Sequence, residues 1–167
     1  MRGLQIIKEL EKKLHSLIDS TVTYCRTGGG ASSILLLRLT DDSKVWAWRY
    51  WEISQGDTLL ACANDDDTPI TGKMAMAAQS LEGLKIIDIR LVKNSLNLGI
   101  LFEDSKELWL YTEVETNKDL LSLINWEIQF PTFNLCYIIN SKRIIEKTNY
   151  YESEPGDSRD QRDFEHS

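Results

Sequence analysis

The sequence predicts an α+β fold, in which a mainly antiparallel β-sheet packs against an N-terminal helix and a second, short helix. Residues 4–18 repeat apolar side chains with the period of a helix, and later segments alternate apolar and polar side chains with the period of a strand. Short polar turns join those strands. With 42% apolar residues in 167, the chain can bury one core, so we predict a single domain over residues 1–149.

The N-terminal segment is amphipathic, with lysines and glutamates opposite one apolar stripe. The stripe consists of Leu4, Ile7, Leu10, Leu14, Leu17 and Ile18. Residues rich in β-branched and aromatic side chains then predict strands at 21–25, 34–39, 45–53 and 58–63. We interpret Gly28, Gly29 and Gly30 as a flexible hairpin loop rather than a phosphate loop, because a strand and not a helix follows them.

A second helix is predicted from Thr68 as its N-cap, Pro69 in its first turn and Gly83 as its end. Its apolar stripe is Met74, Ala77, Ala78 and Leu81. Further strands are predicted at 84–92, 96–102, 108–112 and 126–130. Residues 120–124 are ambiguous, and residues 133–139 fit either a strand or a buried turn of helix.

The two halves of the chain resemble each other. Each has the order helix, strand, strand, strand, which makes residues 4–63 and 69–130 candidate pseudo-repeats that share one core. Leu35, Leu37, Leu39 and Trp46 match Leu98, Ile100, Phe102 and Trp109 at an offset of 63. The tripeptide that begins at Trp51 recurs at Trp126 with an offset of 75, so insertions are needed and a chance match stays an alternative.

The chain is acidic, with 26 acidic and 19 basic residues and a net charge of −7. Six carboxylates and only two arginines fall in residues 150–167, which are poor in apolar side chains, so we expect a disordered acidic tail there. No cluster of Lys and Arg suits a nucleic acid, and we expect a basic protein partner instead. No apolar run reaches the roughly 20 residues that cross a bilayer, and no leader is evident, so a cytoplasmic protein without membrane contact is expected.

Catalytic motifs are missing from the sequence. Cys25, Cys62 and Cys136 are far apart and have no zinc-like spacing, so we interpret them as reduced packing residues. His15 lies among polar helix residues, and no nucleophile or phosphate-loop pattern surrounds it. We therefore expect no enzyme, no catalytic residues, no metal and no cofactor.

Two features are candidate binding elements. Trp46 and Trp48 fall on one face of the predicted strand 45–53, whereas Arg49 and Trp51 fall on the other, so one aromatic set is a candidate contact surface. The run Asp65, Asp66 and Asp67 precedes the second helix. Its spacing is poor for calcium, and stabilisation by the helix dipole is the favoured interpretation.

Residues 46–131 carry a pattern that includes Ala47-Trp48-Arg49, the run from Asn64 to Asp67, and Trp126 to Pro131. In this pattern the chain resembles an uncharacterised family of small bacterial cytosolic proteins, some of them immunity-like. The resemblance implies a bacterial cytosolic domain with no assigned reaction, and it supplies no catalytic residue.

Two classes of function follow as expectations. The first is a binding protein that covers the surface of a basic partner through aromatic anchors surrounded by charged residues. In its most specific form, this is an immunity-type protein that occludes a basic toxin. The alternative is an enzyme or a small-ligand sensor with a pocket of carboxylates or aromatic side chains. The sequence leaves the oligomeric state open.

Overall fold

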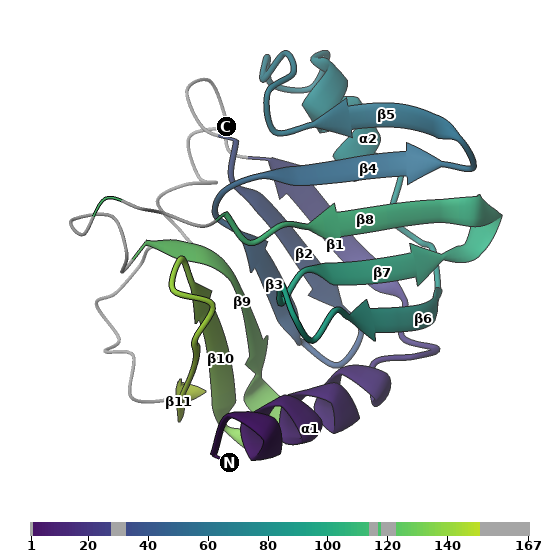
Figure 1. Ribbon diagram of the computed structural model, residues 1–167. Helices are drawn as coiled ribbons and strands as arrows, with labels where there is room; N and C mark the ends of the chain where they lie inside the picture. The colour runs from purple at the N-terminus through teal and green to yellow at the C-terminus, as the bar shows by residue number, and fades with distance from the viewer. Residues whose placement is uncertain (1, 28–32, 114–116, 118–122, 151–167) are drawn as a thin grey trace.

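The chain folds into two antiparallel sheets that pack face to face (Figure 1). The computed structural model describes residues 2–27, 33–113, 117 and 123–150. Sheet I has the strand order β1-β2-β3-β9-β10-β11, and sheet II has the order β5-β4-β8-β7-β6. In sheet I the strands are β1 (Val22–Thr27), β2 (Leu35–Leu39), β3 (Lys44–Ala47), β9 (Ile124–Phe130), β10 (Leu135–Asn140) and β11 (Ile145–Asn149). In sheet II they are β4 (Trp51–Gln55), β5 (Thr58–Cys62), β6 (Ile86–Leu91), β7 (Leu98–Phe102) and β8 (Lys106–Leu110). The α+β class predicted from the sequence is therefore confirmed.

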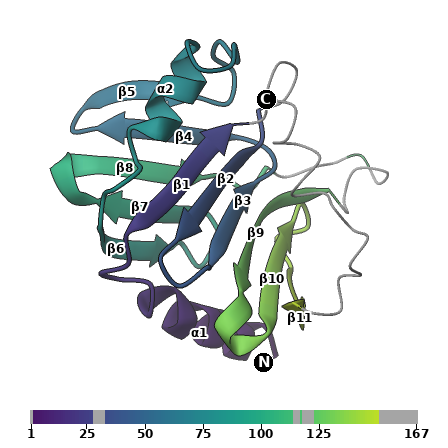
Figure 2. The ribbon, with the colours of Figure 1, turned by 180° about the vertical axis from the view of Figure 1, so that it is seen from behind.

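Two helices close the open sides between the sheets. Helix α1 (Arg2–His15) contacts β6 and β11, and helix α2 (Lys73–Gln79) contacts β1 and β5. Each helix thus bridges an edge strand of one sheet and an edge strand of the other, as the front and rear views show (Figures 1 and 2).

The interior is one cluster of apolar side chains shared by both sheets and both helices. Alternation along each strand supplies it, because every second residue points inward. Leu10, Leu14 and Leu17 of the α1 segment enter the same cluster. The predicted stripe is therefore buried in its central part, whereas Ile7 and Ile18 are half-buried and Leu4 is 62% exposed. The helix itself ends at His15, and turns continue to Asp19.

The chain changes sheets where one continuous strand was predicted. Residues 45–53 do not form a single strand: β3 ends at Ala47 in sheet I, and β4 begins at Trp51 in sheet II. The linking residues 48–50 lie next to the return crossing from β8 to β9, because the Tyr111 amide donates to the Tyr50 carbonyl at 3.1 Å. The apolar alternation continues through the crossing, and this is why the sequence pattern did not reveal the break.

The two halves follow the same order of elements. A helix precedes a three-stranded meander, β1-β2-β3 in sheet I and β6-β7-β8 in sheet II, and the next strand then crosses to the other sheet. The buried indoles of β4 and β9 also make equivalent hydrogen bonds. Trp51 Nε1 donates to Ser33 O at 2.6 Å, and Trp126 Nε1 donates to Leu96 O at 2.9 Å. Ser33 and Leu96 each precede the second strand of a meander. Duplication of an ancestral unit stays a prediction.

Other segments differ from the expectation. Helix α2 begins at Lys73 with Gly72 as its N-cap, so the predicted cap at Thr68 and Pro69 is wrong. Residues 133–139 contribute strand β10 after a short turn of 3₁₀ helix, Pro131–Phe133, and a further 3₁₀ turn, Glu103–Ser105, precedes β8. Strand β11 was not predicted.

Some expectations concern residues whose structure is not described. The glycine loop 28–30, most of the ambiguous segment 120–124 and the tail beyond Tyr150 lie outside the described residues. Within the described part, no helix is both long enough and apolar enough to cross a membrane.

Candidate functional site

The predicted tryptophan set is divided between the two sheets. Trp46 is 1% exposed on the outer face of sheet I, and the Trp48 ring stacks on it with centroids 5.1 Å apart and planes 14° from parallel. Trp51 points into the core and is fully buried. Trp46 and Trp51 therefore offer no surface in this conformation, and Trp48 is half-buried.

Arg49 lies in the crossing between the sheets. Its guanidinium forms an ion pair with the Glu113 carboxylate, and its Nη1 atom donates to Ser141 Oγ at 3.2 Å. Glu113 follows β8, and Ser141 follows β10. Arg49 therefore ties the first crossing to the return crossing and to sheet I.

The three aspartates shape the loop between β5 and α2. Asp65 accepts a hydrogen bond from the Cys62 amide at 2.7 Å and lies 3.9 Å from Lys73 Nζ. Asp66 Oδ1 accepts from both the amide and the hydroxyl of Thr68, at 3.0 and 2.6 Å, and these bonds lower the pKa of Asp66. No aspartate side chain caps α2, whose N-cap is Gly72, but the Asp66 backbone carbonyl accepts from the Met74 amide at 3.2 Å in the first turn of the helix. Stabilisation of the run by the helix dipole stays a prediction. Among the residues described, no group of three His, Cys, Asp or Glu side chains is placed to hold a metal ion.

The outer face of sheet II carries a cluster that the sequence analysis missed. It consists of Tyr50, Glu52, Glu107, Trp109 and Tyr111, and we call it the acid–aromatic face. The register of β4 and β8 sets Glu52 opposite Trp109 and Glu107 opposite Ser54. Trp51, Ile53, Leu108 and Leu110, which alternate with these residues, belong to the core, so the side chains of the cluster lie on the outer face of sheet II. Sheet II is in front of sheet I in Figure 1, so this outer face is turned toward the viewer. All five are half-buried.

Two tyrosines hold the carboxylate at the centre of this face. Tyr50 Oη donates to Glu52 Oε1 at 2.8 Å, and Tyr111 Oη donates to Glu52 Oε2 at 3.1 Å. The two rings are 5.6 Å apart at their centroids, and Trp109 lies 6.5 Å from Tyr111. Glu52 is therefore fixed in orientation and flanked by aromatic rings.

Gly99 of β7 provides the space for Trp109. A Cβ atom at position 99 would lie 2.5 Å from the indole ring, so the ring rests directly on the glycine backbone. The indole Nε1 atom donates to Glu107 Oε2 at 3.0 Å. Like Glu52, Glu107 is thus held by an aromatic donor.

The tyrosines of this face are poor acids. The hydrogen bond to Glu52 raises the pKa of Tyr50 above its usual range, and burial together with the same carboxylate raises the pKa of Tyr111 to about 12. Both hydroxyls therefore stay protonated near neutral pH and serve as donors. A carboxylate fixed between rings is suited to a cation, through charge-assisted hydrogen bonds and cation–π contacts.

The equivalent carboxylate on sheet I is closed off. Glu127 occupies in β9 the place that Glu52 occupies in β4, and it is only 6% exposed. It accepts from Trp48 Nε1 at 2.7 Å, and the Cys136 thiol donates to its other oxygen at 3.4 Å. The repeated Trp-Glu-Ile tripeptide was the sequence signal for these two glutamates. Of the two glutamates, the one on sheet II is therefore the more accessible, because Glu52 is half-buried and Glu127 is buried.

Comparison of the chain with family models, with curated proteins and with solved structures found no match. The family resemblance over residues 46–131 therefore stays a prediction.

Proposed function

We propose that the protein is a non-enzymatic binding protein whose acid–aromatic face accepts a basic segment of a protein partner. The observation that carries the proposal is the Glu52 carboxylate, which is oriented by two tyrosine hydroxyls and flanked by aromatic rings. Because it is already oriented, it loses little conformational freedom when a lysine or arginine approaches.

The surrounding charge supports a cationic partner. Glu107 lies on the same face, and Asp65 is hydrogen-bonded to Cys62, which pairs with Glu52 across strands β4 and β5. Arg90 of β6 pairs with Gly99 of β7, which in turn pairs with Trp109 of β8, so Arg90 lies in line with the face. Its charge is matched by the Asp88 carboxylate, which is 3.2 Å from Arg90 Nε. With a net charge of −7, the protein attracts basic partners over a distance of about one Debye length, roughly 8 Å at physiological salt.

The energies suit a reversible complex. A cation over an aromatic ring contributes about 0.5–2 kcal/mol, and tyrosine and tryptophan are common anchors of protein interfaces. An immunity-type protein that occludes a basic toxin would use such a face. A cytoplasmic location is part of the same proposal and is supported by the three cysteines Cys25, Cys62 and Cys136, all of which are free thiols.

A calorimetric titration with a short arginine-rich peptide tests the proposal. Glu52→Gln removes the central charge, and Asp42→Asn removes one charge from an exposed turn of sheet I, where the residue has a positive φ of 66° that asparagine tolerates. We expect Glu52→Gln to weaken binding by about tenfold, because a charge-assisted hydrogen bond is lost, and Asp42→Asn to change it by less than about twofold. Equal effects of the two variants would show that only net charge matters and would refute the proposed face.

A further inference from the structure

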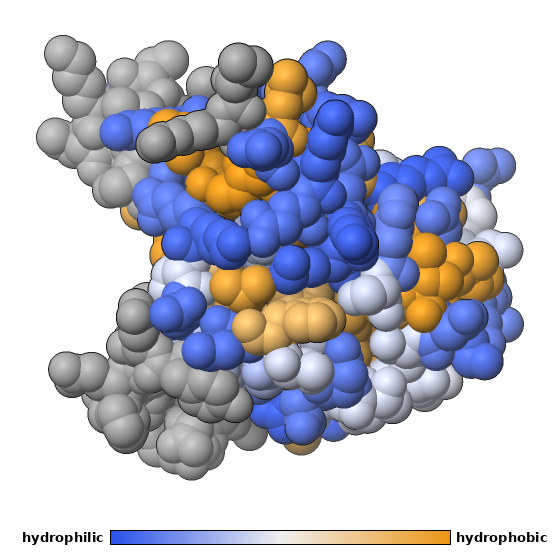
Figure 3. Space-filling view, turned by 90° about the horizontal axis from the view of Figure 1, so that it is seen from below, coloured by the Kyte–Doolittle hydropathy of each residue, from blue (hydrophilic) through white to orange (hydrophobic). Residues whose placement is uncertain are grey.

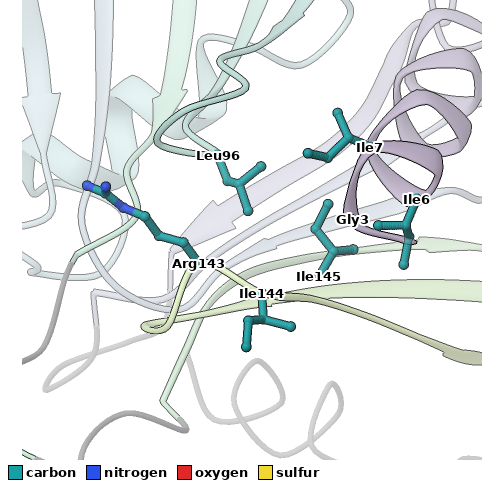
Figure 4. Close-up of a pocket in the computed structure, with 7 residues that line it drawn as sticks. All are labelled: Gly3, Ile6, Ile7, Leu96, Arg143, Ile144 and Ile145. Atoms are coloured by element: carbon teal, nitrogen blue, oxygen red, sulfur yellow. The ribbon is translucent and has the colours of Figure 1, made fainter. Parts of the chain in front are cut away.

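A groove of about 330 Å³ lies where the first turn of α1, the β10–β11 turn and the β6–β7 loop meet (Figure 4). Its lining is aliphatic except for one residue, and it consists of Gly3, Ile6, Ile7, Leu96, Arg143, Ile144 and Ile145. The side chains of Ile7, Leu96 and Ile145 point toward one another. Figure 3 views the face that carries α1 and shows apolar side chains between hydrophilic ones.

The groove exists because α1 extends past the core at its N-terminal end. Leu10 and Leu14 are buried, but Ile6 and Ile7 are half-buried and Leu4 is 62% exposed. At Gly3 no atom lies within 4 Å of where a Cβ would be, so the groove is open beside the helix backbone.

The two loops that form the other walls are held firmly. Leu96 has a positive φ of 62°, and its carbonyl accepts from Trp126 Nε1 at 2.9 Å and from Thr112 Oγ1 at 3.1 Å. In the β10–β11 turn, Asn140 Oδ1 accepts from the amides of Lys142 and Ile144 at 3.0 and 3.3 Å. The groove is therefore formed before any ligand arrives, as most small-molecule sites are.

Arg143 gives the groove a charged end. Its stem lines the groove, and its guanidinium extends to the end away from Gly3 (Figure 4). Within the described part of the chain, no carboxylate pairs with it, although the protein carries a net charge of −7. An unpaired guanidinium at the end of an aliphatic groove is complementary to an anion with an apolar tail.

We propose that this groove binds a small amphipathic anion, an aliphatic chain of medium length that ends in a carboxylate. The chain contacts Ile7, Leu96 and Ile145, and the carboxylate accepts hydrogen bonds from the Arg143 guanidinium. The site is separate from the acid–aromatic face, so it does not depend on the proposed function.

Calorimetric titration with decanoate, below its micellar concentration, tests the site, and decanol serves as the uncharged analogue. We expect decanoate to bind at least about tenfold more tightly than decanol, because one charge-assisted interaction separates them. Arg143→Gln keeps the stem and should abolish that difference. Lys142→Gln removes an equal charge from the same turn, outside the lining, and should preserve it.

Gly3→Leu tests the position of the ligand. A Cβ atom at position 3 would have no atom of its surroundings within 4 Å, so we expect folding to be unaffected, which circular dichroism checks. We expect it to occupy the groove and to weaken both ligands by at least about tenfold, since apolar contact drives their binding. The proposal is overturned if wild-type protein gives no heat with decanoate, if decanol binds equally well, if Gly3→Leu has no effect, or if the Arg143 and Lys142 variants behave alike.

Discussion

Replacing Gly99 by alanine should displace the Trp109 ring from the acid–aromatic face. A Cβ atom at position 99 would lie 2.5, 2.6 and 2.8 Å from three atoms of the indole, whereas carbon atoms pack at about 3.5–4.0 Å. The ring must therefore retreat by about 1 Å. Its 3.0 Å hydrogen bond to Glu107 is then lost or stretched, at a cost of about 1 kcal/mol.

A double-mutant cycle isolates this contact. In a Trp109→Ala background the new methyl group has space, and alanine should stabilise the strand by about 0.5–1 kcal/mol, because glycine is unfavourable within strands. The gain in strand propensity applies in both backgrounds and cancels in the cycle, so the coupling energy is the cost of displacing the indole, about 1 kcal/mol or more. Urea unfolding of the wild type, the two single variants and the double variant measures it, and near-ultraviolet circular dichroism reports the displaced indole. A coupling energy below about 0.5 kcal/mol would refute the packing of Trp109 on Gly99.

Three further predictions concern titration, thiol reactivity and the core. The pKa of Tyr111 is raised to about 12 in the folded protein, so as the pH rises the unfolded chain loses this proton before the folded protein does. The free energy of unfolding should therefore fall between pH 10 and 12, and Tyr111→Phe should make this fall less steep. Iodoacetamide should label half-buried Cys62 before Cys25, which is fully buried and whose pKa is raised to about 12 by burial; faster labelling of Cys25, seen by mass spectrometry, would contradict the packing. Leu14→Ala should lower the free energy of unfolding by about 2–5 kcal/mol, since the side chain is 1% exposed, and a loss below about 1 kcal/mol would contradict its place in the core.

The fold class could be predicted because periodicity is a local property. The α1 stripe has the period of a helix, and the strands of the two meanders have the alternating pattern of strands. These patterns predict the secondary structure of both segments. The sheet change at residues 48–50 could not be predicted, because aromatic and apolar side chains continue through it and only hydrogen bonds to another segment distinguish a crossing from a strand. Strand β11 was missed because it is an edge strand with mostly exposed, polar side chains.

The candidate site was harder to predict than the fold. Tyr50 and Glu52 are close in sequence, but Glu107 in β8 and Tyr111 just after it come more than fifty residues later. Only the register between β4 and β8 brings the two pairs together. Trp46 and Trp51, which stand out in the sequence, are buried in the fold and so are not available to a partner. The aspartate run is prominent for its charge, yet two of its members satisfy nearby loop donors.

The most direct test of the acid–aromatic face is the response of the indole N–H signals in ¹H–¹⁵N spectra to an arginine-rich peptide. The chain has five tryptophans, and only Trp109 belongs to the face, so Trp109→Phe identifies its signal. We predict that the Trp109 signal shifts as the peptide is added and that the signals of the core residues Trp51 and Trp126 stay in place. An unchanged Trp109 signal at saturating peptide would contradict binding at this face.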